Sequence, residues 1–183
     1  MEMILKSRRV RFTFLLLALL VLLASVPASI LRVHADDGAA IALDFSATNV
    51  TPRDVEDTTQ KAIQREYAAA WKNMEDALAQ NRLDLIDQSF VGTAHNELVK
   101  RIEQQEKNGL STKFVDKGHK AEVVFYSPEG TALQLRDTAE FEQQTMDGGK
   151  TVHTETLRQQ YTVIFTLVED RWKVRILQAL PAA

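Results

Sequence analysis

Histidines, and the carboxylates spaced among them, are the residues of this sequence best suited to acid–base or metal chemistry. The chain has four histidines, His34, His95, His119 and His153. No two of them stand four residues apart, as a zinc-binding helix face requires, and no phosphate-binding glycine loop occurs. The absence of cysteine excludes disulfides, thiolate catalysis and cysteine-based metal centres. We therefore expect no metal ion and no cofactor, while a Ser–His–Asp group assembled in space stays open.

Some polar residues fall in step with apolar ones along the strands predicted near the C-terminus. Asp137 shares its phase with Leu135 and Phe141, and Gln159 and His153 share the phase of Tyr161. Residues of one parity line one face of a strand, so these polar groups would point toward the core. Burial without a partner costs about 1–3 kcal/mol per group, so they would line a polar cavity, pair with one another or lie beyond the cover of the helices. A bulge that reverses the phase would instead leave Asp137 in solvent.

A candidate ligand site follows from these polar positions and from aromatic residues at helical spacing. Its members are Tyr67, Trp71, Asp137, Phe141, His153, Gln159 and Tyr161. Asp137 and His153 would be the acid–base pair of a small hydrolase, isomerase or dehydratase. A carrier of a small apolar ligand, held near Tyr67, Trp71 and Phe141, is a second possibility. A filled core without catalysis is the third, and we name no catalytic residue.

Three helices are predicted to hold the aromatic residues. Thr51 and Pro52 are typical of a helix start, and a single apolar face follows at the three- and four-residue spacing of a long helix: Ile63, Tyr67, Ala70, Trp71, Met74, Ala77 and Leu78. A short helix spans about 83–90. A third ends at Asn108 and Gly109, a common helix stop.

Four antiparallel strands are predicted after the helices. Apolar and polar residues alternate over 114–126, 131–145, 151–168 and 171–180, and turn residues separate these segments. Alternation places one face of each strand on the core and the other in water. We therefore predict an α+β domain over 51–183, in which about three helices pack on a curved antiparallel sheet of about four strands.

The N-terminal residues 1–35 predict a membrane anchor or a signal peptide, and 36–50 a linker. Lys6, Arg8, Arg9 and Arg11 precede an uncharged run over 12–31. About 20 apolar residues suffice to cross a bilayer, and the cations would stay in the cytoplasm. A cleavage site after Ala35 is the competing reading. Both readings put the domain on the extracytoplasmic side, either membrane-anchored or secreted.

The charge of the predicted domain argues against nucleic-acid binding. Five of the 22 cations but only one of the 25 anions lie within 1–35, which leaves a net charge of −7 on the remainder. Such a surface repels phosphate backbones. Arg171, Lys173 and Arg175 alternate with apolar residues on the last strand, and their wet face would meet Glu140 across the sheet or dock a protein partner.

The order of elements resembles the nuclear transport factor 2-like superfamily, a cone of helices over a curved sheet. The resemblance rests on the long helix with Tyr67 and Trp71, the short helix over 83–90 and the closing hairpin over 161–174. Within the superfamily the chain is most similar to membrane-tethered, non-enzymatic members. Examples are the IMS domain of plastid and cyanobacterial division proteins and the periplasmic domain of type IV secretion assembly proteins. The superfamily also contains polyketide cyclases and dehydratases.

The expected function is therefore a non-catalytic, membrane-tethered or exported domain that binds a protein partner or a second copy of itself. The alternative is a small-molecule-binding or acid–base enzyme that uses Asp137 and His153. A filled cone would favour the first, and a concave pocket with converging titratable groups would favour the second.

Overall fold

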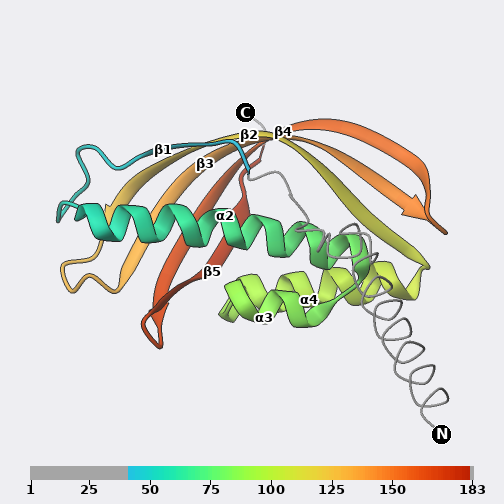
Figure 1. Ribbon diagram of the computed structural model, residues 1–183, viewed down its shortest axis with the longest axis horizontal. Coiled ribbons are helices and arrows are strands. Elements are labelled where there is room, and N and C mark those ends of the chain that lie inside the picture. Colours follow the sequence, from blue (N-terminus) through green and yellow to red (C-terminus); the bar gives the residue numbers. More distant parts are fainter. Residues whose placement is uncertain (1–40, 182–183) are drawn as a thin grey trace, which may run out of the picture. The chain divides into compact units, whose positions relative to one another are not determined.

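The computed structural model describes residues 41–181, in which helices pack against one face of a curved sheet (Figure 1). The elements follow the order β1 (Leu43–Ser46), α2 (Asp57–Gln80), the short 3₁₀ turn η1 (Leu83–Leu85), α3 (Ile86–Ser89), α4 (Gly92–Lys107), β2 (Leu110–Tyr126), β3 (Ala132–Asp147), β4 (Lys150–Val168) and β5 (Arg171–Ala179). The predicted leader, 1–35, lies outside the described residues. No helix within 41–181 has the length and apolar character needed to span a membrane.

The sheet has five strands in sequence order and is mixed, so the prediction of four antiparallel strands was wrong by one. The additional strand, β1, comes from the stretch predicted as a linker and runs parallel to β2, with Leu43 opposite His119 and Ser46 opposite Glu122. Four residues are too few to show a reliable alternation, and their pairing partner lies far along the chain. Only the tertiary structure therefore reveals this strand.

The three antiparallel hairpins agree with the predicted strands and turns. β2 pairs with β3, β3 with β4, and β4 with β5. The β3–β4 turn contains Gly148 (φ 52°) and Gly149 (φ 81°), and two successive positive φ values are what glycine allows at little cost. Glu169 and Asp170 turn the chain into β5, also with positive φ. The hairpin geometry was therefore readable from the sequence.

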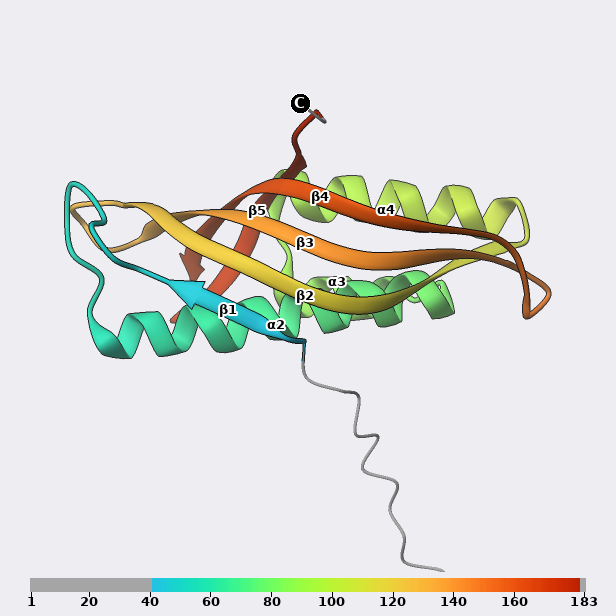
Figure 2. The same cartoon turned by 90° about the horizontal axis from the view of Figure 1, so that it is seen from above.

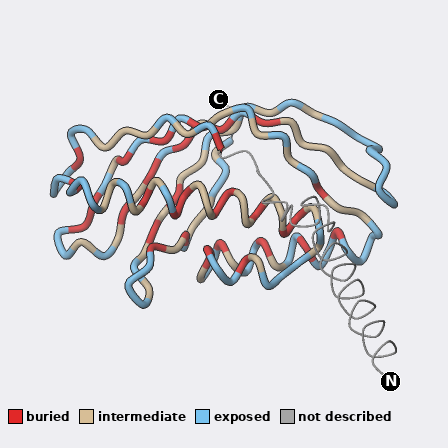
Figure 3. Tube along the Cα trace, viewed as in Figure 1, coloured by how far each residue is buried: buried red, intermediate tan, exposed pale blue. Residues whose placement is uncertain are grey.

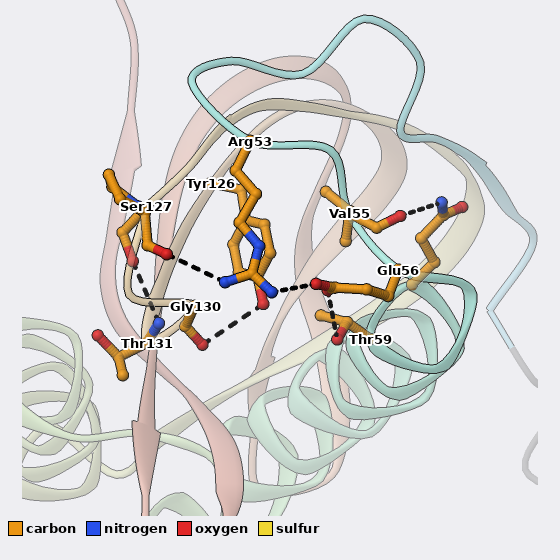
Figure 4. Close-up of polar contacts among 10 residues, drawn as sticks. Arg53, Val55, Glu56, Thr59, Tyr126, Ser127, Gly130 and Thr131 are labelled. Carbon is orange, nitrogen blue, oxygen red and sulfur yellow. Dashed lines mark hydrogen bonds and ion pairs between the residues drawn. The ribbon is translucent and has the colours of Figure 1, made fainter.

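The long helix α2 begins at Asp57 rather than at Thr51 and Pro52 as predicted. The preceding segment is fixed to the β2–β3 turn instead, because the N–H of Tyr126 donates to the carbonyl of Thr51 at 3.3 Å. Arg53 lies over the Tyr126 ring, pairs with Glu56 and donates to the carbonyl of Pro128 at 3.0 Å (Figure 4). These contacts hold residues 51–56 in a non-helical conformation, and the helix starts after them.

The core lies between the concave face of the sheet and the helices, which cover that face in both views (Figures 1 and 2). Buried positions accordingly fall on the sheet side of α2 and along the middle of the strands (Figure 3). Large side chains with almost no exposure fill this layer, among them Tyr67, Phe90, Phe165, Ile63 and Leu78. Full burial of one such side chain contributes about 1.5–3 kcal/mol. The three predicted helices are thus confirmed as one layer.

The cations predicted on the wet face of β5 reach the helices instead of the acidic residues of β3. Arg171 Nη2 lies 3.3 Å from Glu66 Oε2 of α2, and Lys173 Nζ donates to the carbonyl of Asp87 at 2.9 Å. Glu140 pairs instead with Arg158 of β4, whose Nε lies 3.3 Å from Glu140 Oε1. The β5 cations do not meet β3 because β4 lies between the two strands, and β5 borders the segment after α3 at Phe90 instead.

Candidate functional site

Asp137, in the middle of β3, is the centre of a buried polar group beneath α2. Its side chain has no exposed surface. The hydroxyl of Tyr67 donates to Asp137 Oδ2 at 2.6 Å, and His119 Nδ1 lies 2.7 Å from the same oxygen. The inward phase predicted for Asp137 is therefore correct, and the alternative in which a bulge leaves it in solvent is wrong. One carboxylate oxygen joins helix α2 to strand β2.

His119 carries this polar group from the core to the sheet edge, because its second ring nitrogen also meets a carboxylate. His119 Nε2 lies 3.2 Å from Asp116 Oδ1. Asp116 in turn accepts from the N–H of Gly118 at 3.2 Å and from that of Ala42 at 3.3 Å. When both carboxylates are ionised, both ring nitrogens can donate only as the imidazolium. The chain Tyr67–Asp137–His119–Asp116 thus ties α2 and the β1 edge to the sheet.

Aromatic rings surround this polar chain and remove it from water. The Trp71 ring lies 4.4 Å from the His119 ring and 5.5 Å from the Tyr161 ring, centroid to centroid. Burial, and then the charge of Asp137, raise the pKa of Tyr67 well above its usual value, so this hydroxyl stays a donor. Burial likewise raises the pKa of Tyr161 to about 12. Neither phenol is therefore poised for proton transfer near neutral pH.

Asp137 is shielded from solvent, because it has no exposed surface. The gap among Tyr67, Trp71 and Phe90 has no room for a water molecule. Two polar atoms here, Asp137 Oδ1 and Trp71 Nε1, have no hydrogen-bond partner among the described residues. The site therefore resembles a packed core with two unsatisfied polar atoms more than a substrate cavity.

The structure brings together most, but not all, of the predicted site residues. Tyr67, Trp71, Phe141 and Tyr161 all surround Asp137 or its neighbours, with Trp71 6.2 Å from Phe141. Gln159 is half-buried and donates to the carbonyl of Leu180 at 2.6 Å instead.

His153 is not part of this group. It is exposed and pairs with Thr145 near the end of the β3–β4 hairpin. Tyr161, which lies opposite Asp137, is eight residues away along β4, or about 26 Å.

His119 is the partner of Asp137 that sequence reasoning missed. The signal was present, because His119 shares the phase of the buried residues Ala121 and Val123. The alternation of β2 could have placed it inward, but a register shift between Asp116 and Gly118 obscures the pattern on its N-terminal side. No three histidine, aspartate or glutamate side chains among residues 41–181 converge in a way that could hold a metal ion.

Glu75, one turn beyond Trp71 on α2, is the titratable residue nearest to this group with a displaced pKa. Burial, and then the negative charge of Asp116, raise its pKa to about 7, while Lys72 and His119 oppose the shift. The carboxyl therefore changes charge near neutral pH. It lies at the border of the polar chain, where partial exposure to solvent tolerates either form.

An open pocket of about 300 Å³ lies next to this closed centre, between α4 and the strands. Its apolar wall includes Met74, Leu98 and Leu177, and its polar groups include Arg101 and Tyr161. Arg101 lies over the Phe114 ring, 5.8 Å from its centroid, and donates to Gln143 Oε1 at 3.2 Å.

Arg101 gives this pocket a positive charge. Arg101 is exposed, and the atoms packed around it nevertheless lower its pKa by desolvation. No carboxylate among residues 41–181 forms an ion pair with it. The pocket is of the size that small ligands or single side chains occupy.

A wider depression of about 560 Å³ lies beside β1, lined by residues such as Asp44, Lys120 and Glu140. Its charges are of both signs, and Glu140 is already paired with Arg158. The depression is open and has no apolar floor of large side chains, so it is a weaker candidate than the pocket under α4.

Comparison with solved structures identifies the architecture. The intermembrane space region of the chloroplast protein ARC6 superposes with a TM-score of 0.60 at 13% sequence identity, over 67% of this chain and 96% of that one. The chain has the nuclear transport factor 2-like fold. At this identity the likeness is one of fold alone.

Other proteins with the nuclear transport factor 2-like fold match less closely. One, described as a dehydratase of this family from Streptomyces avermitilis, has a TM-score of 0.49 at 13% identity, over 70% of this chain and 99% of that one. Another, described as a scytalone dehydratase from Novosphingobium aromaticivorans, has a TM-score of 0.46 at 16% identity, over 68% and 85%. No protein-family model and no curated protein matches the sequence. A shared fold does not give function, so the function has to be argued from the site.

Proposed function

We propose that this chain is a non-catalytic binding domain, tethered to a membrane or exported across it, that holds a protein partner. The observation that carries the proposal is the closure of the cone around Asp137. A general acid or base must come within hydrogen-bond distance of the group that it protonates or deprotonates. Asp137 has no exposed surface, so a substrate has no access to it.

The partners of Asp137 support the same conclusion. Its Oδ2 oxygen accepts from Tyr67 and His119, and the aromatic rings of Trp71 and Phe165 pack around the Tyr67 ring. Hydrogen bonds to a charged acceptor are worth about 1.5–3 kcal/mol each when both groups are buried. These hydrogen bonds hold α2 against the sheet, so a structural role is sufficient to explain why the polar chain is buried.

The pocket under α4 is the proposed docking site for the partner. Arg101 lines it together with Met74, Leu98 and Leu177, and has no carboxylate partner in the described part of the chain. A guanidinium over an aromatic ring suits a carboxylate that arrives with an apolar neighbour. We therefore expect the partner to insert an apolar side chain flanked by an acidic group.

The proposed location of the domain, across a membrane from the cytosol, rests on the sequence. The basic residues and uncharged run of 1–35 favour export or anchoring, and the net charge of the remainder disfavours nucleic acid. ARC6 contributes a region of this fold to an intermembrane space, which is also a compartment across a membrane from the cytosol. The domain proposed here would face such a compartment.

A charge reversal on α4 tests the proposal. The full chain, in membranes of its source, is used to capture partners, and each purified partner is then titrated against wild type, Arg101→Glu and Lys100→Glu. Lys100 is exposed and does not line the pocket, so Lys100→Glu is a matched control. Loss of a buried ionic contact costs about 2–5 kcal/mol, so Arg101→Glu is expected to weaken binding at least about tenfold.

The binding result can be interpreted only if both variants are folded. Thermal unfolding must show the same midpoint for both variants, since neither residue belongs to the core. Equal affinities of Arg101→Glu and Lys100→Glu for every captured protein would remove the pocket from the binding function. If the protein turned over small carbonyl or hydroxyl compounds and a folded Asp137→Asn variant did not, the proposal of a binding domain would be wrong and the enzyme alternative would be supported.

A further inference from the structure

The outer edge of β4 is open over about half of the strand. β5 pairs with β4 only from Tyr161 to Val168, and beyond that the N–H of Leu180 donates to the carbonyl of Gln160. From Lys150 to Gln159, β4 has β3 on one side and no strand among residues 41–181 on the other. The β3–β4 hairpin reaches past the end of β5 in Figure 1. Every second residue of such an edge points its N–H and C=O away from the sheet, ready to pair.

The middle of this edge lacks several features that usually prevent pairing, although Lys150 and Arg158 flank it and Glu155 lies within it. Between Thr151 and Leu157 it contains no lysine, arginine, proline or glycine, and threonine and valine favour strands. Val152 is 58% exposed and has no partner on β3, because the register shifts there.

The open edge of β2 is different. It carries Lys113 and Lys117 within its length, and lysine side chains protect an edge from pairing.

We propose that the β4 edge pairs with the same edge of a second copy of this chain, antiparallel and about a two-fold axis at Thr154. In this register His153 of each copy lies opposite Glu155 of the other, so opposite charges meet twice when the histidine is protonated. Val152 meets Thr156, and the two Thr154 side chains meet on the axis. The sheets of the two copies then become one continuous sheet.

Two other symmetric registers, with the axis at Glu155 or at Thr156, are less favourable. An axis at Glu155 places the two Glu155 carboxylates opposite each other, and like charges at that distance are destabilising. An axis at Thr156 places Glu155 opposite Leu157, so that a half-buried carboxylate loses water without gaining a partner. A two-fold pairing uses the same residues twice and closes as a dimer, which fits a segment that is complementary to itself.

The pairing does not depend on the pocket under α4, and its test is separate. Because the chain has no cysteine, single-cysteine variants report contacts without background. The full chain, in mild detergent, is oxidised as Thr154→Cys and as Thr156→Cys. Residues opposite each other on an axis have Cα atoms about 4.5–5.5 Å apart, which suits a disulfide. The two copies of residue 156 would be about 13 Å apart, too far for a bond.

The expected result is a disulfide-linked dimer of Thr154→Cys, formed at least about ten times faster than that of Thr156→Cys, on the geometric requirement for the bond. Both threonines are exposed on the same strand, so random collision would cross-link them equally. Unchanged thermal midpoints of the reduced variants confirm that both are folded. Equal rates, faster cross-linking at 156, or no cross-link at either position would overturn the proposal.

Discussion

Replacement of Asp137 by asparagine distinguishes a structural carboxylate from a catalytic one. The substitution keeps the shape of the side chain and removes its charge. Asp137 accepts from Tyr67 at 2.6 Å and from His119 at 2.7 Å through a single oxygen. If that oxygen holds α2 on the sheet, loss of its charge weakens both contacts at once. If instead the residue is retained for chemistry, its replacement by a neutral side chain tends to raise stability.

The magnitude follows from the two hydrogen bonds. Each falls from about 1.5–3 kcal/mol for a charged acceptor to about 0.5–1.5 kcal/mol for a neutral one. The asparagine amide group would also occupy the position of Oδ1, which has no partner among the described residues, and would leave donors unsatisfied there. We therefore expect Asp137→Asn to lower the free energy of unfolding by about 3 kcal/mol.

Urea unfolding of the full chain, followed by tryptophan fluorescence, measures this change, because Trp71 lies against His119. Tyr67→Phe serves as the matched control, since it removes one of the two donors and should cost about 1–2 kcal/mol. The double variant should cost less than the sum of the two, because the substitutions share one contact. An Asp137→Asn variant as stable as the wild type, or more stable, would refute the clamp and favour the catalytic alternative.

Two further predictions concern pH and backbone conformation. The pKa of Glu75 is raised from 4.5 to about 7, so the folded state holds a proton that the unfolded state releases, and stability falls as pH rises from about 4.5 through 7. Glu75→Gln should therefore match the wild type near pH 4.5 and exceed it by about 1 kcal/mol at pH 8, allowing for partial exposure, in thermal melts across that range. A constant difference would contradict the assignment. Gly130 has φ +71°, and a Cβ there would lie 2.9 Å from Tyr126 Oη and 3.0 Å from Arg53 Nη1 (Figure 4). Gly130→Ala should lower the free energy of unfolding by about 1–3 kcal/mol, and an unchanged urea midpoint would show that the turn relaxes freely.

At this site, the alternation of apolar and polar residues predicts which way a side chain points but not which residue it contacts. The parity of β3 predicts that Asp137 points inward, and the helical spacing of α2 predicts the same of Tyr67. Neither pattern reports which residue of another strand lies nearby. His153 and His119 were equally available as partners in the sequence, and pairing register together with a register shift in β2 selects His119. A choice between two histidines thus depends on contacts between residues that are distant along the chain.

By itself, the sequence determined the α+β class, the long amphipathic helix and the four long strands with their turns. These depend on local properties: the 3.6- and two-residue periods of apolar side chains and the conformations that glycine allows. The tertiary structure alone decided the fifth strand, the start of α2 at Asp57, the closure of the cone over Asp137 and the open edge of β4. Each of these arises where segments far apart in sequence meet, and the free energy of those contacts is not encoded in any one segment.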